Sequence, residues 1–311
     1  MEHFIDRSIS TSRWNNLQEP RLTINSGDEI VFEMRDASDG QVKKGMTGEE
    51  FSKIDTTRIH GLTGPVNIHG ASPGDTLQID ILEYEHEGWA WTSIIPGLGL
   101  LENRFEKHHL HHWELDGKIT KSIRGVTLDL NPFCGIIGVQ RTDEGEFRTR
   151  PPGPWGGNMD VKHLTAGTSL FLPVFTEGAG LCAGDSHAAQ GDGEVCINGM
   201  EAPMKARFKV TVHKGKKITA PYAITPGQQI SSRYTAKPFH TFIESDEDPR
   251  FACQRVVERA MVYIEGRLGI PSSLAYILCS VVLDLKVSQL VNVPMTTISG
   301  YLPEAIFDKP I

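Results

Sequence analysis

The sequence predicts a mainly β fold, with a β-sandwich or barrel body and a short C-terminal helical hairpin. Short apolar segments fill the first two-thirds of the chain, and several alternate between apolar and polar residues, as half-buried antiparallel strands do. Gly, Pro and Asp separate these segments in the way that turn residues do. After residue 245 the alternation gives way to helical spacing. Many short strands joined by frequent turns favour a sandwich or a barrel.

The alternation is clearest in residues 76–82 (TLQIDIL), where Leu77, Ile79 and Ile81 share one face of the expected strand. The segment 73–75 (PGD) before this strand is typical of a turn. Further strands are expected at residues 29–34, 169–175, 194–197 and 206–212, and further turns at 26–28 and 192–193.

The C-terminal part predicts helices. Asp248 and Pro249 are an N-cap residue and a first-turn proline for a helical pattern that ends at Gly269. A second helix is expected from after Ser272 to about Leu283, which completes the hairpin. We expect one unit over residues 1–311, with a possible subdivision into an N-terminal β part (1–150), a central β part with the site motif (151–245) and a helical tail (246–311).

The composition excludes several classes of function. The 311 residues carry 31 Lys and Arg against 39 Asp and Glu, a net charge of −8, and lack the basic cluster that phosphate binding needs. The longest apolar run, 274–283, is shorter than the roughly 18 residues of a membrane span, and residues 1–6 show no secretory leader. Five scattered cysteines fit reduced thiols. We therefore expect a cytoplasmic protein that binds neither nucleic acid nor membrane.

The densest group of polar residues lies at 184–194 (GDSHAAQGDGE). Its glycines let the backbone turn sharply, so that Asp185, His187, Gln190 and Glu194 can reach one pocket. Histidine nitrogen and carboxylate oxygen are ligands that zinc takes, and a remaining carboxylate could act as a general base towards water. The alternative is a plain turn in which the aspartates cap backbone amides and the histidine is an ordinary surface group. The residues alone leave both interpretations open.

A second polar group lies upstream at 156–160 (GGNMD). Asn158 could recognise an amide or donate to an oxyanion, and Asp160 could bind a metal or orient another group. An Asx turn is the more frequent explanation for such a pair. Weaker signals come from Glu33 and Asp36 near the end of an early strand, and from His60 before a Leu-Thr-Gly-Pro segment.

Two further features invite a functional interpretation. The run from His108 to His112 (HHLHH) resembles a metal-binding stretch, but Glu106 and Glu114 are the only carboxylates close to it, and its role stays open. Cys182 could be a nucleophile if His187 lowered the pKa of its thiol. Its alternating strand position fits a small buried hydrophobic residue better.

Three segments together resemble the acetamidase/formamidase family: 156–164 (GGNMDVKHL), 167–179 (GTSLFLPVFTEGA) and 184–195 (GDSHAAQGDGEV). The resemblance extends over nearly the whole chain and is weakest at 85–149. It implies a mainly β fold, amidase activity on short linear amides and a homodimer or higher homo-oligomer. Carried over residue by residue, it marks Asn158, Asp160, Asp185, His187, Gln190 and Glu194, with Glu33, Asp36 and His60 as secondary candidates.

The expected mechanism is attack of water on the amide. In it a divalent metal, with zinc as the first candidate, is held by His187 with Asp36, Asp160 or Asp185, and Glu194 accepts and returns a proton. Asn158 orients the amide or its oxyanion, and Gln190 and His60 contact the substrate. No nucleotide or redox cofactor is expected. Three alternatives stay open, namely an acid/base pair of carboxylates without metal, a covalent amidase using Cys182, and a β binding module without catalysis.

Overall fold

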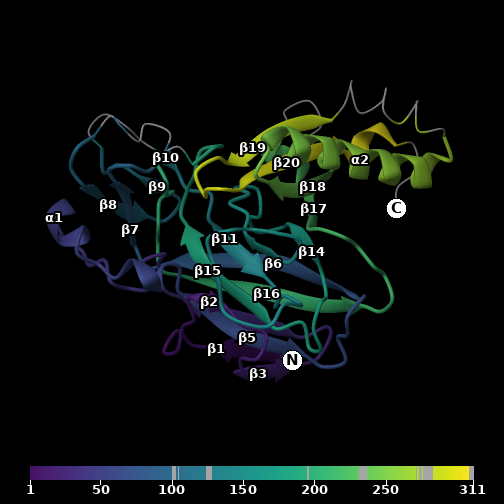
Figure 1. Ribbon diagram of the computed structural model, residues 1–311, viewed down its shortest axis with the longest axis horizontal. Helices are drawn as coiled ribbons and strands as arrows, with labels where there is room; N and C mark the ends of the chain where they lie inside the picture. The colour runs from purple at the N-terminus through teal and green to yellow at the C-terminus, as the bar shows by residue number, and fades with distance from the viewer. Residues whose placement is uncertain are drawn as a thin grey trace.

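The computed structural model describes residues 1–311 except 100–102, 104, 124–127, 195, 231–236, 271, 273–274, 276–282 and 308–311 (Figure 1). Within the described residues the chain is mainly β, as predicted, and forms four sheets. Two of these sheets face each other and make a sandwich. The two smaller sheets and a long C-terminal helix lie around this body (Figure 1).

The largest sheet has nine strands, in the order β1-β4-β16-β6-β14-β17-β18-β20-β19. It takes strands from the beginning, the middle and the end of the chain, and all neighbours are antiparallel except β1 and β4. The bounds are β1 (Glu2–Ile5), β4 (Glu29–Met34), β6 (Thr76–His86), β14 (Ser169–Pro173), β16 (Met204–His213), β17 (Tyr222–Thr225), β18 (Phe239–Asp246), β19 (Asp284–Gln289) and β20 (Thr296–Pro303).

A five-stranded sheet packs on the large one, in the order β13-β11-β15-β5-β3. The apolar residues between the two sheets form one cluster, to which β4 and β16 contribute Phe32 and Phe208, and β5 and β11 contribute Val66 and Ile137. Burial of these side chains is the main source of stability of the body. The bounds are β3 (Leu22–Ile24), β5 (Leu62–Ile68), β11 (Phe133–Gly138), β13 (Gly156–Asn158) and β15 (Leu181–His187).

The remaining strands form two small sheets, β10-β9-β8-β7 and β12-β2. The histidine run lies at the start of β8, which pairs with β7, and His112 Nε2 contacts the Met46 carbonyl at 2.8 Å. The bounds are β2 (Arg13–Trp14), β7 (Trp89–Ile94), β8 (His109–Asp116), β9 (Ile119–Thr120), β10 (Leu128–Asp129) and β12 (Phe147–Arg148), with α1 (Gly48–Phe51) and the 3₁₀ turns Thr56–Arg58, Gly227–Gln229 and Glu304–Ile306.

Helix α2 (Pro249–Leu268) confirms the first predicted helix. The Asp248 side chain accepts a hydrogen bond from the Arg250 amide, and Gly269 ends the helix in the left-handed conformation, with φ 64°. The buried face of α2 packs against β18 and β20. The second predicted helix falls mostly on residues outside the described ones. Among the described helices, none combines the length and the apolar character that a membrane crossing requires.

Three of the four further predicted strands are confirmed, as β4, β14 and β16, and the strand expected at 76–82 is the first part of β6. The strand expected at 194–197 is wrong. Glu194 and Ile197 have φ values of 50° and 89°, and a backbone in the left-handed region cannot continue a strand. This segment is a loop instead, and the loop carries Glu194 into the site described below.

Gly300 of β20 tests the contact between the large sheet and α2. A Cβ atom at this position would overlap Val256 Cγ1 of the helix, so we expect Gly300→Ala to lower the free energy of unfolding by about 1–3 kcal/mol. Gly266→Ala on the same helix is the matched control, because its Cβ would meet no atom within 4 Å, and alanine favours a helix. Thermal melting of both variants checks this. Equal melting temperatures would contradict the tight contact.

Candidate active site

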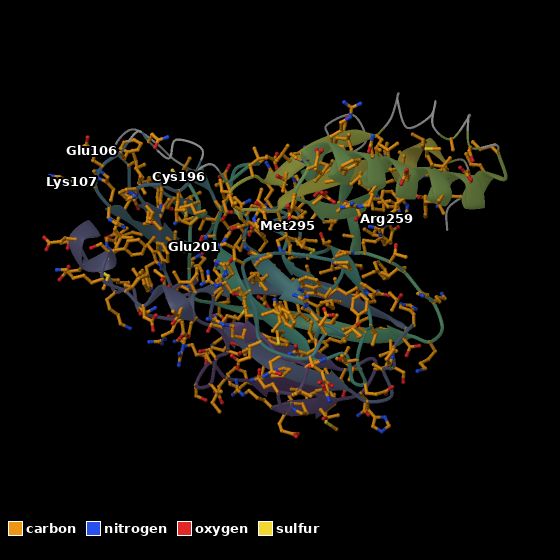
Figure 2. The ribbon with its side chains drawn as sticks, in the orientation of Figure 1. Glu106, Lys107, Cys196, Glu201, Arg259 and Met295 are labelled. Atoms are coloured by element: carbon orange, nitrogen blue, oxygen red, sulfur yellow. The ribbon has the colours of Figure 1, made fainter. Side chains whose placement is uncertain are left out.

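Buried polar side chains gather at the end of the five-stranded sheet. Strand β15 carries Asp185 and His187, and Asp160 follows strand β13, which is separated from β15 by β11 in the same sheet. The connection from β15 to β16 contributes Glu194 and Glu201. Each of these five side chains is at most 5% exposed. Figure 2 labels Glu201, whose backbone bridges Trp91 of β7 on one side and His187 on the other.

Gln190 determines which nitrogen of His187 faces the carboxylates. Its side-chain nitrogen donates to the carbonyl oxygens of Asp160 at 3.0 Å and Ser288 at 3.3 Å, so its oxygen points at His187. That oxygen lies 2.8 Å from His187 Nδ1, which must therefore carry the hydrogen. In a neutral ring Nε2 then has a free lone pair, the form in which histidine binds a metal.

Three carboxylates surround His187 Nε2. The nearest oxygens belong to Glu201 at 3.0 Å, Asp185 at 3.5 Å and Glu194 at 4.0 Å. The short contact with Glu201 does not have the direction of a hydrogen bond, and Nε2 has no hydrogen-bond partner among the residues that the structure describes. Two groups of converging ligand atoms share this histidine, one with Asp160 and Asp185 and the other with Glu194 and Glu201.

Within the described part of the chain, several buried atoms of this cluster lack a hydrogen-bond partner. A buried polar atom without a partner costs about 1–3 kcal/mol. A group of such atoms therefore indicates room for a ligand that would satisfy them. Gly135 contributes to that room, because a Cβ at this position would lie 2.5 Å from Asp160 Oδ1 and 3.0 Å from Asp185 Oδ2. The unpartnered atoms are Asn158 Oδ1, Asp160 Oδ1, His187 Nε2, Glu194 Oε2 and Glu201 Oε2.

The backbone is strained where it carries the carboxylates. Asp160, Asp185 and Glu194 have φ values of 50°, 51° and 50°, in the left-handed region that residues with a side chain seldom adopt. Such conformations cost roughly 1–3 kcal/mol each and persist only where the surroundings enforce them. Because three acidic residues of one site share this conformation, the strain is part of how the site aims their side chains.

Burial and neighbouring charges shift the pKa of each ionisable group in the cluster. Burial, together with a neighbouring aspartate, raises the pKa of Asp160 and of Glu194 well above the usual carboxyl range. Burial raises the pKa of Glu201 to about 7. For Asp185 burial is outweighed by His60 and His187, which lower its pKa to about 2. Burial also opposes the charge on His187, but Glu201 and Asp185 hold its pKa well above the usual value. The cluster therefore attracts cations.

The site opens into a cavity of about 40 Å³. Asp185, Glu194 and Glu201 line it, and Phe51, Trp91, Ile95 and Ile197 contribute apolar wall. His60 also lines the cavity, with Nε2 3.8 Å from Asp185 Oδ2. The polar remainder of the wall consists of Arg150, Asn158, Asn198 and Asn292.

The residues singled out from the sequence fall into three groups in the structure: those in or at the edge of the cluster, one that positions His187, and those that lie apart. Asn158, Asp160, Asp185, His187 and Glu194 come together in the cluster, and His60 lies at its edge. Gln190 forms its hydrogen bonds with His187 and two carbonyl groups, so its role is to position the histidine. It is not among the described residues that line the cavity.

Asp36 and Glu33 lie apart from the metal groups. Asp36 accepts hydrogen bonds from Ser38 and from Trp91 Nε1 at 3.1 Å, and it belongs to neither group of ligand atoms found among the described residues. It therefore supports Trp91, a wall of the cavity, from behind. Glu33 on β4 accepts a hydrogen bond from the Arg7 amide and does not line the cavity.

Sequence reasoning missed four residues of the site: Trp91, Arg150, Glu201 and Asn292. Asn292 follows strand β19 and donates to Asp160 Oδ2 at 2.7 Å. Glu201 stands among apolar residues (GMEAP), and a lone acid in such surroundings is a signal for a buried functional carboxylate. Nothing in the neighbourhood of Trp91 or Arg150 in the sequence indicated the site.

The thiol of Cys182 is on the other side of β15. It is fully buried in an apolar cluster with Trp14, Leu62 and Ile136, and its one hydrogen-bond acceptor is the Gly180 carbonyl at 3.8 Å. Burial raises the pKa of this thiol to about 12. It does not line the cavity of the carboxylates. The structure therefore supports the packing role of Cys182 and gives the covalent alternative no support.

Comparison with known proteins identifies the class to which this site belongs. The sequence profile of the Acetamidase/Formamidase family matches residues 5–144 and 139–309. The chain belongs to this family, and it is an enzyme of the amide-hydrolysing class.

Individual relatives agree over most of the chain. A formamidase from Methylophilus methylotrophus is 24% identical over 96% of this chain and 90% of its own length, and an acetamidase from Mycolicibacterium smegmatis is 28% identical over 59% and 61%. Among solved structures, an acetamidase from Bacillus halodurans has a TM-score of 0.89 at 29% identity, with 98% of both chains covered. A gamma lactamase from Delftia acidovorans has a TM-score of 0.69 at 25% identity, covering 100% and 95%.

Replacing Cys182 by alanine tests its packing role. We expect a loss of stability on the order of 1 kcal/mol, from the contacts of the sulfur with Trp14, Leu62 and Ile136. Amide hydrolysis should stay within about tenfold of the wild type, which corresponds to about 1.4 kcal/mol of barrier. Steady-state rates and thermal melting measure the two effects. A well-folded variant that is slower by several orders of magnitude would make Cys182 the nucleophile.

Proposed function

We propose that the cavity beside His187 hydrolyses the C–N bond of short linear amides such as formamide and acetamide. The observation that carries the proposal is the cluster of one imidazole and four buried carboxylates, in which Asp185, Glu194 and Glu201 also line a small cavity. Several atoms of this cluster have no hydrogen-bond partner among the described residues. A binding module without catalysis would have no use for so many desolvated acids, each of which costs free energy. Membership of the family and the names of the relatives point to the same reaction.

The size of the cavity supports a substrate of few atoms. A water molecule occupies about 30 Å³ in the liquid and needs roughly 10–15 Å³ of free space around its centre. By the second measure the cavity of about 40 Å³ holds roughly three water-sized groups. Formamide has three heavy atoms and acetamide four. Trp91 and Ile197 limit what else could enter.

We further propose that a divalent cation, with zinc as the first candidate, binds in the cluster. On a tetrahedral zinc, neighbouring donors are about 3.3 Å apart, and the distances from His187 Nε2 to Glu201 and Asp185 lie on either side of this value. Asp160 completes the group that Asp185 and His187 begin. When bound, the cation would polarise the carbonyl and acidify water.

Glu194 is the proposed proton carrier. Its carboxylate is the farthest of the three from His187 Nε2 and has a free oxygen facing the cavity. The oxygen of water forms a bond to the carbonyl carbon, and Glu194 takes a proton from that water. It then gives this proton to the nitrogen, and the C–N bond breaks to give the carboxylic acid and ammonia. The acid proton passes to ammonia, so the final products are the carboxylate and ammonium. Asn158, beside Glu194 at the cavity, orients the amide.

Ammonia release tests the proposed function. The purified protein should release ammonia from formamide or acetamide without nucleotide or redox cofactor. The likeness to the lactamase is tested separately with a γ-lactam, whose ring opening to the amino acid is followed by chromatography because it releases no ammonia. Metal analysis should find a divalent ion that chelation removes together with activity, and added zinc should restore both. Ammonia release at full rate from metal-free protein would replace the metal by a carboxylate acid/base pair. A folded protein that is inactive on every amide would end the proposal.

Paired variants separate the proton carrier from the metal ligands. Glu194→Gln keeps shape and hydrogen bonding but cannot accept a proton, so kcat should fall by at least about 10²-fold while the metal content stays at the wild-type level. Asp185→Asn is its counterpart and should lose metal and activity together. Rates and metal content are measured on the same preparations. If Glu194→Gln loses the metal, the group with Glu194 and Glu201 holds it instead.

A further inference from the structure

The chain around Arg150 directs this side chain into the cavity. Arg150 follows strand β12, and the neighbouring Thr149 is fully buried, with its hydroxyl accepting the His60 amide at 3.0 Å. Pro151 and Pro152 come next and restrict the backbone, because each ring fixes φ. Arg150 itself lines the cavity with the carboxylates of Asp185 and Glu194.

The guanidinium of Arg150 makes no hydrogen bond and no ion pair within 4.0 Å to any residue that the structure describes. Elsewhere, partly buried arginines have such partners. Arg35 and Arg58 pair with Asp39, and Arg259 pairs with Glu244. Burial lowers the pKa of Arg150 and so does the charge of Arg148, whereas the longer-range attraction of Glu194 and Asp185 opposes this shift. The donor groups of Arg150 are therefore available to a molecule in the cavity.

The products of the reaction need such a donor. Amide hydrolysis turns a neutral carbonyl oxygen into an oxyanion and then into a carboxylate, and this charge develops in a cavity walled by Asp185, Glu194 and Glu201. Those acids repel an anion. Arg150 is the one Lys or Arg side chain among the described residues that line the cavity. A guanidinium is planar, always charged and matched to the two oxygens of a carboxylate.

We propose that Arg150 binds the acyl oxygen of the amide and, after hydrolysis, the carboxylate of the product. This inference rests on the proposed function, because it assigns the substrate group that Arg150 contacts in that same cavity. Arg150 is then a catalytic residue that touches the reacting group, and its task is separate from the proton transfer by Glu194. A consequence is that acetate and formate are competitive inhibitors, and that their affinity depends on Arg150.

The experiment compares Arg150→Gln and Arg150→Lys with Arg148→Gln. The control removes the same charge two residues away, from the exposed Arg148 at the end of β12. For each protein as purified, kcat and KM for acetamide, the inhibition constant of acetate and the direct binding of acetate by calorimetry are measured. Thermal melting shows whether each variant is folded. If Arg150→Gln does not fold, Arg150→Lys still tests the inference.

Arg150→Gln should weaken acetate binding and lower kcat/KM by about ten- to a hundredfold, the range for a hydrogen bond to a charged group. Arg150→Lys keeps the charge but not the paired donors, so it should lose about three- to tenfold. Arg148→Gln should stay within about twofold. Unchanged acetate affinity in a folded Arg150 variant, or no acetate binding to the wild type, would overturn the inference while hydrolysis stands. If no amide is hydrolysed, the proposed function fails, and calorimetry still decides the role of Arg150.

Discussion

The hydrogen bond between Gln190 and His187 Nδ1 is the contact on which the rest of the site depends. It leaves Nε2 as the atom that faces the carboxylates, and it is itself set by two backbone carbonyl groups, one of them that of Asp160. The side chain that aims the histidine thereby also ties down the backbone of a second acidic residue. The other neutral tautomer would present Nε2–H to the cluster, and its Nε2 could not share a lone pair with a cation.

Forming the site opposes folding, and the stability of the β-sandwich offsets this free energy. Strained backbone at Asp160, Asp185 and Glu194, unpartnered buried oxygens and repulsion among acids together oppose folding by several kcal/mol. The apolar cluster between the two large sheets supplies burial to offset this. Because β15 belongs to that sandwich and ends in Asp185 and His187, the rigid element holds the two residues directly.

Local patterns in the sequence predicted local structure well. Alternation placed β6, and Asp248, Pro249 and Gly269 bounded α2, because a strand face and a helix cap are decided by neighbouring residues. The same reasoning failed at residue 194, where a short apolar segment looked like a strand but tertiary contacts enforce a left-handed backbone. Short segments carry too little periodicity to outweigh such contacts.

The site shows the same limit. Its polar residues at 158–160 and 185–194 could be found because two glycine-rich segments concentrate them. Arg150 and Trp91 lie elsewhere in the chain, and Trp91 reaches the site through its backbone bridge to Glu201. A buried acid near a strand end, such as Asp36, fits either a ligand or a support. The hydrogen bond that it accepts from Trp91, and its place outside both groups of ligand atoms among the described residues, favour the support. Spacing along a chain identifies what residues can do. The sheet that brings them together determines which of them do it, and here that sheet brings one free guanidinium to the wall of an acidic cavity.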